Sequence, residues 1–453
     1  MKREALDYLE EWKSRKSRRP LVLRGSRQIG KSWLVRQFAK QSFDKILELN
    51  FEDNKHLADI FHLPVDECLH LLELEFNLTI TPGKTLIFLD EIQAAPEVFA
   101  RLRYFYEQKP ELHIIAAGSL LEFLLANSSF AVPVGRIEYM YLGPMNFREF
   151  LHACSEKKLL AYLVNWQVDQ TLPESIHLKL RRYFQKFLYL GGMPESISSW
   201  LASGQNLRES DIIKESILKT YEEDFIKYSG RFDPLVLQKL FHQLPLVVGR
   251  KFKYSQIMPE QRAQKVQEAY RLLQSARVTQ PIYHSSANGI PLSAEQKEKT
   301  YKPLFLDCGL MLRANGLSLR DLEQNLSLIN KGALAEQIVG QFLLYSGEFF
   351  EEPQLHYWVR EAKGSSAEVD YVMAIHGQVI PIEVKAGKTG SLKSLQQFII
   401  DKKATLAVRF NDDLPSVCHT NAKGNDFTLI SLPLYMAGEV KRLLAKSISP
   451  QES

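Results

Sequence analysis

The sequence contains little cysteine and no long apolar run. Its four cysteines, Cys68, Cys154, Cys308 and Cys418, are scattered and never form a CxxC pair. This pattern favours neither a disulfide framework nor a zinc site, and it fits a reducing compartment. No apolar stretch approaches the roughly 20 residues that a membrane-spanning helix needs. The first twenty residues are highly charged and lack the apolar core of a signal peptide. We therefore expect a cytoplasmic protein with no membrane partner.

A large excess of one charge is also absent. Lysine and arginine number 57 against 53 aspartate and glutamate, giving a net charge of +4 and a pI near 8.6. This mild basicity is compatible with nucleic acid without arguing for it. The chain is 45% hydrophobic and 24% charged, which is typical of a folded soluble protein. Its 453 residues exceed what one core usually holds, so we expect two to four domains.

The chain changes character twice along its length. In the first 150 residues, short apolar runs at 20–25, 45–51, 85–92 and 112–119 alternate with amphipathic stretches. This alternation predicts an α/β unit whose parallel sheet is covered by helices. The next part is largely helical, and the end of the chain returns to mixed structure after a predicted helix at 332–345. The predicted domains are 1–165, 166–325 and 326–453.

Residues 25–32, GSRQIGKS, match the phosphate-binding motif GxxxxGK[ST] at every fixed position. They follow a predicted strand and open a predicted helix, which is the context this motif requires. Backbone N–H groups of such a loop wrap the phosphates, while Lys31 would reach the β- and γ-phosphates and Ser32 would bind Mg²⁺. The residues expected to bind the nucleotide are Gly25, Ser26, Arg27, Gln28, Ile29, Gly30, Lys31, Ser32 and Trp33.

A second acidic motif supports this assignment. TLIFLDE at 85–91 is an apolar strand that ends in two acids. Asp90 would hold Mg²⁺ through water, and Glu91 would polarise the attacking water. An apolar run ending in acids is by itself often only a strand end. Together with the phosphate loop it predicts a site for ATP and Mg²⁺ in which Lys31 and Glu91 are catalytic.

Two further residues are candidates for the same site. Ser119 follows the strand-like run HIIAAG and could sense the γ-phosphate, although serine is also a favoured helix N-cap. Arg136, in VPVGRIEYM, could supply positive charge to the transition state, in its own chain or from a neighbouring subunit of a homo-oligomer. A surface arginine on an edge strand explains Arg136 equally well from spacing alone.

Several blocks of the sequence together resemble a known family. GSRQIGKS, LIFLDEIQ, IIAAGSLLEFL, VGRIEYMYLGPMNFREFL and YLGGMPESI look like successive blocks of the AAA-type ATPases of bacteria and archaea that carry a C-terminal domain of unknown function. The resemblance spans nearly the whole chain. It implies an ATPase core, a helical and winged-helix-like middle, and a C-terminal α/β domain similar to the PD-(D/E)xK nucleases, with their restriction-endonuclease-like fold. It also supports Arg136, which matches the family's GR block. It implies no settled biological role.

The middle of the chain offers two weaker signals for nucleic acid. Residues 251–283 predict a helix-turn-helix followed by a strand, a unit that can place a helix in the major groove. Such units in ATPases often serve only as lids or contacts between domains. The basic run KSRKSRR at 13–19 carries five positive charges, but a run of this kind is usually a solvated face.

Residues 368–385, EVDYVMAIHGQVIPIEVK, predict two strands joined by a two-residue turn at His376-Gly377. This register places Asp370 opposite Glu383, and like charges in that position destabilise a hairpin. A bound divalent cation is the simplest way to make the pairing favourable, because carboxylate oxygens suit Mg²⁺ or Mn²⁺. Lys385 shares a face with Glu383 and could orient the attacking water.

A third carboxylate comes from the helix predicted before the hairpin. Glu336 falls among apolar neighbours on one helical stripe, where a carboxylate costs free energy unless it is paired or bound to metal. Glu336, Asp370, Glu383 and Lys385 resemble the PD-(D/E)xK site residue by residue, with Asp370, Glu383 and Lys385 as catalytic residues and the three acids as metal ligands. The alternative is an ordinary cross-strand salt bridge between Asp370 and Lys385.

Two functions remain open at this point. The first is an ATP-hydrolysing enzyme coupled to DNA binding or processing, whose C-terminal domain cleaves phosphodiesters with a metal. The second is a regulatory ATPase switch whose nuclease-like domain is inactive and docks nucleic acid or a protein partner. The complete set of four site residues favours the first, and the modest net charge favours the second.

Overall fold

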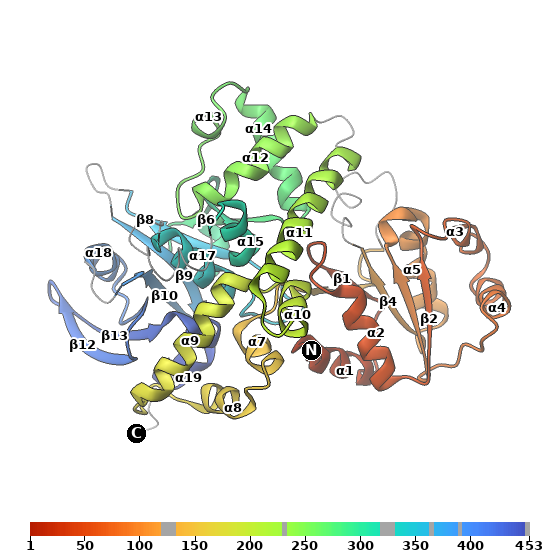
Figure 1. Ribbon diagram of the computed structural model, residues 1–453, viewed down its shortest axis with the longest axis horizontal. Helices are drawn as coiled ribbons and strands as arrows, with labels where there is room; N and C mark the ends of the chain where they lie inside the picture. Colours follow the sequence, from red (N-terminus) through yellow and green to blue (C-terminus); the bar gives the residue numbers. More distant parts are fainter. Residues whose placement is uncertain (119–132, 229–232, 318–330, 362–366, 388–391, 449–453) are drawn as a thin grey trace.

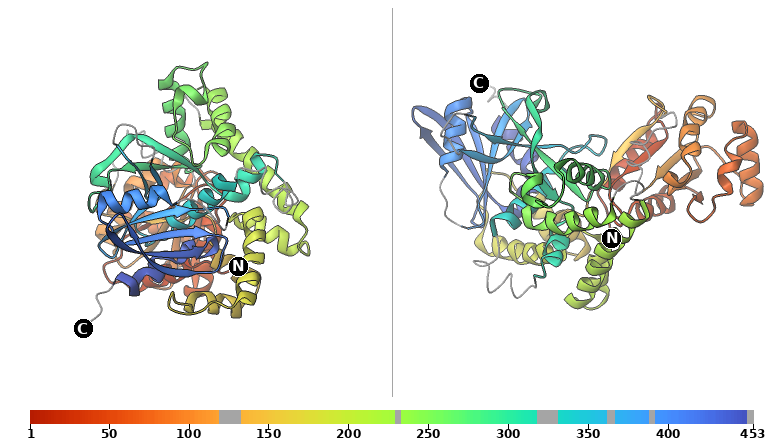
Figure 2. Two further views of the ribbon diagram at one scale, coloured as in Figure 1. Left: turned by 90° about the vertical axis from the view of Figure 1, so that its left-hand side faces the viewer. Right: turned by 90° about the horizontal axis from the view of Figure 1, so that it is seen from above.

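The computed structural model describes residues 1–118, 133–228, 233–317, 331–361, 367–387 and 392–448. Two sheets lie at opposite ends of the molecule, and a group of helices lies between them (Figure 1). The red and orange N-terminal unit forms one end, and the blue C-terminal sheet forms the other, as the view from above also shows (Figure 2). In the described part of the chain, no helix is long and apolar enough to cross a bilayer.

The N-terminal unit is the predicted parallel sheet covered by helices. Its strands run in the order β2-β3-β4-β1-β5, and every neighbouring pair is parallel. All six residues of β3 are buried, as expected for a strand covered on both faces. The elements are α1 (Ala5–Ser14), β1 (Leu21–Arg24), α2 (Lys31–Ser42), β2 (Lys45–Asn50), α3 (Leu57–Ile60), α4 (Val65–Glu75), β3 (Thr85–Asp90), η1 (Ile92–Ala94), α5 (Pro96–Gln108), β4 (His113–Ala117) and β5 (Glu138–Tyr141).

The middle of the chain is helical as predicted, but it ends in two strands. Three helices followed by an antiparallel strand pair, α12 to β7, give the element order of a winged helix. The elements are α7 (Phe147–Ala153), α8 (Lys157–Asn165), α9 (Glu174–Leu190), α10 (Pro194–Ala202), α11 (Leu207–Tyr228), α12 (Pro234–Val247), α13 (Tyr254–Ile257), α14 (Ala263–Ser275), β6 (Thr279–Ser285), η2 (Leu292–Glu295), β7 (Gln296–Phe305) and α15 (Cys308–Ala314).

The C-terminal sheet has eight strands in the order β12-β13-β11-β10-β9-β8-β6-β7. The last two strands at one side of this sheet, β6 and β7, come from the middle segment, so strands from both sides of the predicted boundary near residue 325 form one continuous sheet. The remaining elements are α17 (Lys331–Leu344), β8 (Leu355–Val359), β9 (Glu368–Ile375), β10 (Gln378–Val384), α18 (Lys393–Lys402), β11 (Leu406–Asn411), β12 (Ser416–Ala422), β13 (Asn425–Pro433), η3 (Leu434–Glu439) and α19 (Val440–Ile448).

The predicted hairpin register is confirmed. β9 and β10 pair antiparallel from Ile375–Gln378 to Tyr371–Ile382. His376 and Gly377 both have positive φ, 47° and 80°, which a two-residue turn of type I′ requires. Ile382 is fully buried and faces the core. Glu383 is the next residue of the strand, so its side chain points to the opposite face of the sheet.

The helical middle shares its core with both ends of the molecule. Tyr221 and Leu240 pack in one cluster with Leu34 of α2, while Phe187 packs in another with Ile382 of β10. Removing a buried phenylalanine such as Phe187 typically costs about 3–5 kcal/mol. The three predicted segments are therefore packed against one another. A conformational change at one end of the molecule can reach the other end only through close-packed side chains.

Candidate nucleotide site and acidic cluster

The phosphate loop lies between β1 and α2, at the carboxyl edge of the five-stranded sheet. Gln28 and Gly30 have positive φ, 62° and 87°, and α2 starts directly after Gly30. A Cβ atom on Gly25 would lie 2.5 Å from the carbonyl oxygen of Leu142, so only glycine fits there. Crevices at this edge are where open α/β sheets bind their ligands. The loop therefore has the tight curvature and the location that a phosphate cradle needs.

Lys31 is buried inside the loop with 8% of its surface exposed. Its Nζ donates to the carbonyl oxygens of Gly25, at 3.0 Å, and Ser26, at 2.8 Å. Burial lowers the pKa of Lys31 to about 8, although the charges of Glu91 and Asp90 act in the opposite direction. The ammonium group is thus held by neutral carbonyls, and an anion brought into the loop would be stabilised by it.

Asp90 and Ser32 meet at the mouth of the loop. Asp90 ends β3 and is buried, and the burial raises its pKa while a hydrogen bond from the Ser32 side chain opposes that rise. Glu91 follows with φ of 49°, and its Oε2 accepts a hydrogen bond from Gln93 Nε2 at 2.6 Å. A hydroxyl, a strand-end carboxylate and a second acid thus lie beside the loop. They are the donor set that Mg²⁺ with a bound triphosphate requires.

The C-terminal acids lie around a lysine that no sequence motif marks. Lys302 on β7 is 2% exposed, and its Nζ lies 2.5 Å from Glu368 Oε1 and 3.9 Å from Glu336 Oε2. Burial lowers the pKa of Lys302, but the charges of Glu336, Glu368 and Asp370 outweigh it, and the net pKa is raised. Lys302 is therefore the counter-ion of this group. We call Lys302, Glu336, Glu368, Asp370, Glu383 and Lys385 the acidic cluster.

The remaining members of the cluster are also paired within the chain. Asp370 Oδ2 accepts from the backbone N–H of Val384 at 2.7 Å, and Lys385 Nζ donates to Glu383 Oε1 at 2.6 Å. Burial and the Asp370 charge raise the pKa of Glu336 to about 8 and that of Glu383 to about 7. Both glutamates therefore bind a proton more readily than an exposed glutamate does.

The predicted three-acid metal site stays a prediction. Within the described ranges, no group of three or more His, Cys, Asp or Glu side chains is placed to hold a metal ion. The three acids lie close enough for the Asp370 charge to raise the pKa of both Glu336 and Glu383. Lysines and a backbone N–H contact one oxygen of each acid, while Glu383 Oε2 is buried without a hydrogen-bond partner in the described part of the chain. Glu368 pairs with Lys302, and Lys385 pairs with Glu383 on its own strand.

Residues 17–151 match the family described as AAA domain. This match covers less than a third of the chain, and we refer to residues 17–151 as the AAA domain after the family that they resemble. Residues 181–321 and 331–435 match two families described as domains of unknown function (DUF8612 and DUF4143). The C-terminal match names no activity, so the expected likeness to the PD-(D/E)xK nucleases stays a prediction. A comparison with curated proteins found no match.

Solved structures similar to this chain include archaeal and bacterial proteins. A Walker-type ATPase of Pyrococcus abyssi is 16% identical, with a TM-score of 0.43, and the alignment covers 69% of this chain and 95% of that one. The ORC2 protein of Aeropyrum pernix, in ADPNP-ADP complexes, is 12% identical, with a TM-score of 0.32 and coverage of 71% and 93%. RuvB of Thermotoga maritima is 15% identical, with a TM-score of 0.26 and coverage of 61% and 87%. At these identities and scores the likeness does not extend to substrates or partners.

Arg136 lies at the far edge of the AAA domain from the phosphate loop. It precedes β5, whose Glu138 pairs with Leu21, while the loop follows Arg24 at the other end of β1. A strand of this length spans roughly 13 Å. Arg136 Nε instead donates to Glu107 Oε1 at 2.8 Å on the surface. Arg136 is therefore separated from the phosphate loop of its own chain, and its role in hydrolysis stays a prediction.

The other predicted residues have simpler outcomes. Trp33 is 41% exposed on the first turn of α2, directly after the loop. Ser119 lies outside the described residues. The basic run is bonded to the AAA domain itself, since Arg15 pairs with Glu138 at 2.7 Å and Arg18 donates to the carbonyl of Glu111 at 2.5 Å. That run is thus a structural feature of the domain.

Several residues near the phosphate loop could not be found from the sequence. Asp224 on α11 accepts two hydrogen bonds of 2.8 Å from Arg27 Nη1. Pro194 of α10 lies 3.6 Å from where a Cβ on Gly30 would be. Arg277, from the turn before β6, lies over the ring of Tyr141 at 5.0 Å, and its charge contributes to lowering the pKa of Lys31. These residues are far from the loop in sequence and belong to no motif, so no local signal marks them.

Proposed function

We propose that the AAA domain binds ATP with Mg²⁺ and hydrolyses it. The observation that carries this proposal is the buried ammonium group of Lys31, held by two carbonyls inside a loop of the GxxxxGKS type. A buried cation without a carboxylate bonded to it is costly, and the phosphates of a nucleotide offset that cost. The acidic residues at the end of β3 supply the other half of the chemistry.

Each residue has a distinct part in the proposed reaction. Lys31 and the loop N–H groups hold the β- and γ-phosphates and stabilise the charge that develops on them. Ser32 and Asp90 hold Mg²⁺, which neutralises phosphate charge when bound. Glu91 orients the attacking water and accepts its proton, and the products are ADP and inorganic phosphate.

Two substitutions test this assignment against each other. Lys31→Ala should lower both ATP affinity and turnover, the latter by about 100-fold or more. Glu91→Gln should lower turnover to a similar extent but keep ATP affinity near the wild-type value, because the amide preserves the shape of the side chain. Turnover is followed by phosphate release and affinity by fluorescent-nucleotide titration. Unchanged turnover in Lys31→Ala would refute the assignment of the loop.

We propose further that the winged-helix-like part of the chain docks nucleic acid. What supports this is the exposed basic side chains at the N-cap of α14, within α14 and on β7, namely Arg262, Lys265, Arg271, Lys297 and Lys299. Phosphate contacts of this kind make binding weaken steeply with salt. Substituting Arg262 and Lys265 together by Ala should weaken binding of a fluorescent DNA duplex and reduce the salt slope by about 2. Equal binding by this variant and wild type would exclude α14 from the interface.

For the acidic cluster we favour the docking function over metal-dependent cleavage. The supporting observation is Lys302, whose ammonium group already balances Glu336 and Glu368 in the buried interior. We expect the wild-type protein to leave linear, branched and single-stranded DNA intact with Mg²⁺ or Mn²⁺. Cutting that disappears in Asp370→Ala and Lys385→Ala, with ATP hydrolysis retained, would establish the nuclease instead.

A further inference from the structure

Two side chains outside the phosphate loop hold two of its carbonyl groups. Arg3, in the segment before α1, is 4% exposed, and its Nη1 donates to the carbonyl oxygen of Ile29 at 2.9 Å. Its Nη2 donates to the carbonyl oxygen of Gly143 at 2.8 Å, just after β5. Arg3 thus joins the phosphate loop to the neighbouring strand end, although 26 residues separate it from Ile29 in the chain.

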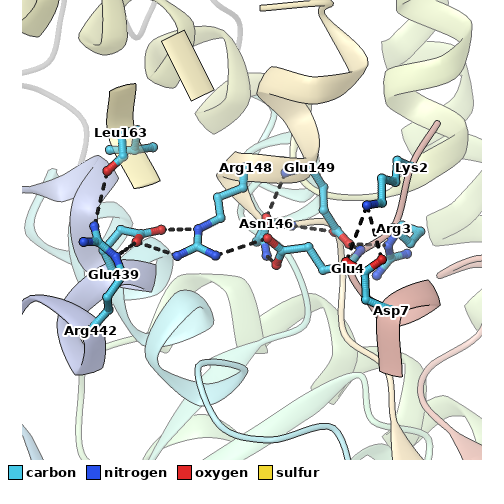
Figure 3. A network of polar contacts seen from close by, with 10 residues as sticks. All are labelled: Lys2, Arg3, Glu4, Asp7, Asn146, Arg148, Glu149, Leu163, Glu439 and Arg442. Atoms are coloured by element: carbon cyan, nitrogen blue, oxygen red, sulfur yellow. Dashed lines mark hydrogen bonds and ion pairs between the residues drawn. The ribbon is translucent and has the colours of Figure 1, made fainter. Parts of the chain in front are cut away.

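The orientation of Arg3 is itself fixed by Glu149 (Figure 3). Arg3 Nε donates to Glu149 Oε1 at 3.0 Å, and both side chains are 5% exposed. The same carboxylate accepts from the backbone N–H groups of Glu4, at 2.8 Å, and Asn146, at 3.1 Å. Because Glu149 also closes the capping box of α7, its own position is determined by the fold. The guanidinium group therefore has little freedom to leave Ile29.

Tyr221 holds the loop from the other side. It lies on α11, is 3% exposed, and its hydroxyl donates to the carbonyl oxygen of Arg27 at 2.8 Å. Burial raises the pKa of Tyr221, so the hydroxyl keeps its proton and remains a donor. Asp224, one turn later on the same helix, fixes the Arg27 side chain. Two alternate carbonyls of the loop, those of Arg27 and Ile29, are thus tied to different parts of the chain.

Peptide geometry turns these two contacts into a constraint on the phosphate-binding groups. A peptide unit is planar and trans, so its C=O and the following N–H point in opposite directions. Holding the carbonyl of Arg27 toward Tyr221 points the N–H of Gln28 away from Tyr221. Holding the carbonyl of Ile29 toward Arg3 points the N–H of Gly30 away from Arg3. Both N–H groups belong to the loop that would wrap the phosphates.

We propose that Arg3 and Tyr221 are positioning residues for the phosphate loop, which keep its N–H donors aimed at the nucleotide. They act through backbone carbonyls and do not touch the nucleotide. This inference rests on the ATP hydrolysis proposed above, and it adds two residues that lie outside the phosphate-binding motif. N–H donors that are held in place before the reaction need no reorganisation during it. Loss of Arg3 or Tyr221 should therefore lower turnover.

Conservative variants test the proposal. Tyr221→Phe removes one hydroxyl, and Arg3→Lys keeps the charge but loses the fork of donors that reaches Ile29 and Gly143 together. We expect kcat to fall about 10-fold in each, with KM changing less than about 3-fold, and about 100-fold in Arg3→Ala. Added guanidinium at millimolar concentration should restore part of the kcat of Arg3→Ala and leave wild type unchanged.

Arg148→Ala is the matched control. Arg148 belongs to the same polar network, where its Nη1 donates to Glu4 Oε1 at 3.3 Å and its Nη2 to Glu439 Oε2 at 2.5 Å, but these bonds do not reach the loop (Figure 3). It should unfold at a lower temperature with wild-type kcat and KM. If Tyr221→Phe and Arg3→Lys are folded and hydrolyse ATP like wild type, the inference is wrong. If wild type itself shows no turnover that depends on Lys31, the proposed function fails instead.

Discussion

Lys31 and Lys302 are two buried lysines whose pKa values move in opposite directions. Lys31 is 8% exposed and Lys302 is 2% exposed, so burial alone would lower the pKa of each. The pKa of Lys31 falls to about 8, whereas that of Lys302 rises. The difference lies in what the two ammonium groups bind. Lys31 donates to two neutral carbonyls, and Lys302 lies between the carboxylates of Glu336 and Glu368.

This contrast separates a site prepared for an anion from one that is already neutralised. A buried cation that is held by carbonyls is stabilised when an anionic ligand binds next to it. A buried cation among carboxylates gains nothing from such a ligand, and it competes with any metal for the same oxygens. The electrostatics of the AAA domain therefore favour ligand binding, while those of the acidic cluster favour a fixed, charge-balanced interior. Four measurements sharpen or break this comparison.

The largest expected effect follows from removing Lys302. Lys302→Met leaves the partly buried Glu336, Glu368 and Asp370 without their counter-ion, so the free energy of unfolding should fall by about 3–5 kcal/mol. Denaturant unfolding measures it. Lys299→Met, on an exposed position of the same strand, should change stability by less than about 0.5 kcal/mol. A loss below about 1 kcal/mol for Lys302→Met would mean that Lys302 is not the counter-ion of the cluster.

The next effect concerns the proton on Glu336. Burial and Asp370 raise its pKa from 4.5 to about 8, so the folded protein keeps a proton that the unfolded chain has lost. Stability contributed by this group is therefore complete below pH 4.5 and falls as the pH rises toward 8. Glu336→Gln removes the dependence, so it should match wild type near pH 4.5 and become progressively more stable than wild type as the pH rises toward 8.

The measurement is unfolding by denaturant across this pH range, with the exposed Glu348→Gln as control. Parallel stability curves for wild type and Glu336→Gln would show that Glu336 is ionised in the folded state. In that case Lys302 would balance a full negative charge, and the contrast with Lys31 would be stronger.

Local sequence patterns predicted much of the phosphate loop and of the acidic cluster. The phosphate loop is eight consecutive residues between a strand and a helix, so its position follows from short-range order alone. The register of β9 and β10 was predicted correctly because a two-residue turn leaves no choice of pairing. Even Glu336 was placed correctly among apolar neighbours by its helical spacing, and it is mostly buried in the structure.

The sequence patterns did not predict contacts between residues that lie far apart in the chain. Lys302 lies on β7, in a segment assigned to another domain, and it reaches the cluster only because β6 and β7 join the C-terminal sheet. The position of Arg136 follows from topology, because a residue just before a parallel strand lies at the amino edge of the sheet and the phosphate loop lies at the carboxyl edge. Arg3 and Tyr221 contact carbonyls, which no side-chain pattern predicts.

The pH dependence of nucleotide binding tests the other lysine. Because the pKa of Lys31 is about 8 without ligand, its proton is present below pH 8 and lost above it. Phosphates favour the charged form, so ATP affinity should fall up to tenfold per pH unit above pH 8, and binding should take up a proton there. Calorimetry in buffers of different ionisation enthalpy measures this uptake. An affinity that stays constant to pH 10 would place the pKa of Lys31 at its ordinary value and remove the contrast.

The smallest expected effect concerns the stability of the ligand-free protein, which substitution of Lys31 should raise and substitution of Lys302 should lower. At pH 7 Lys31 is charged in the folded and unfolded states, and the shift from 10.5 to about 8 corresponds to a cost of about 3 kcal/mol. Lys31→Met removes that cost but also two hydrogen bonds of about 1 kcal/mol each. The ligand-free protein should therefore gain about 1 kcal/mol of stability, while the exposed Lys40→Met stays near wild type. If Lys31→Met were instead as damaging as Lys302→Met, both lysines would be structural counter-ions, and the phosphate loop would lose its claim to be the site prepared for an anion.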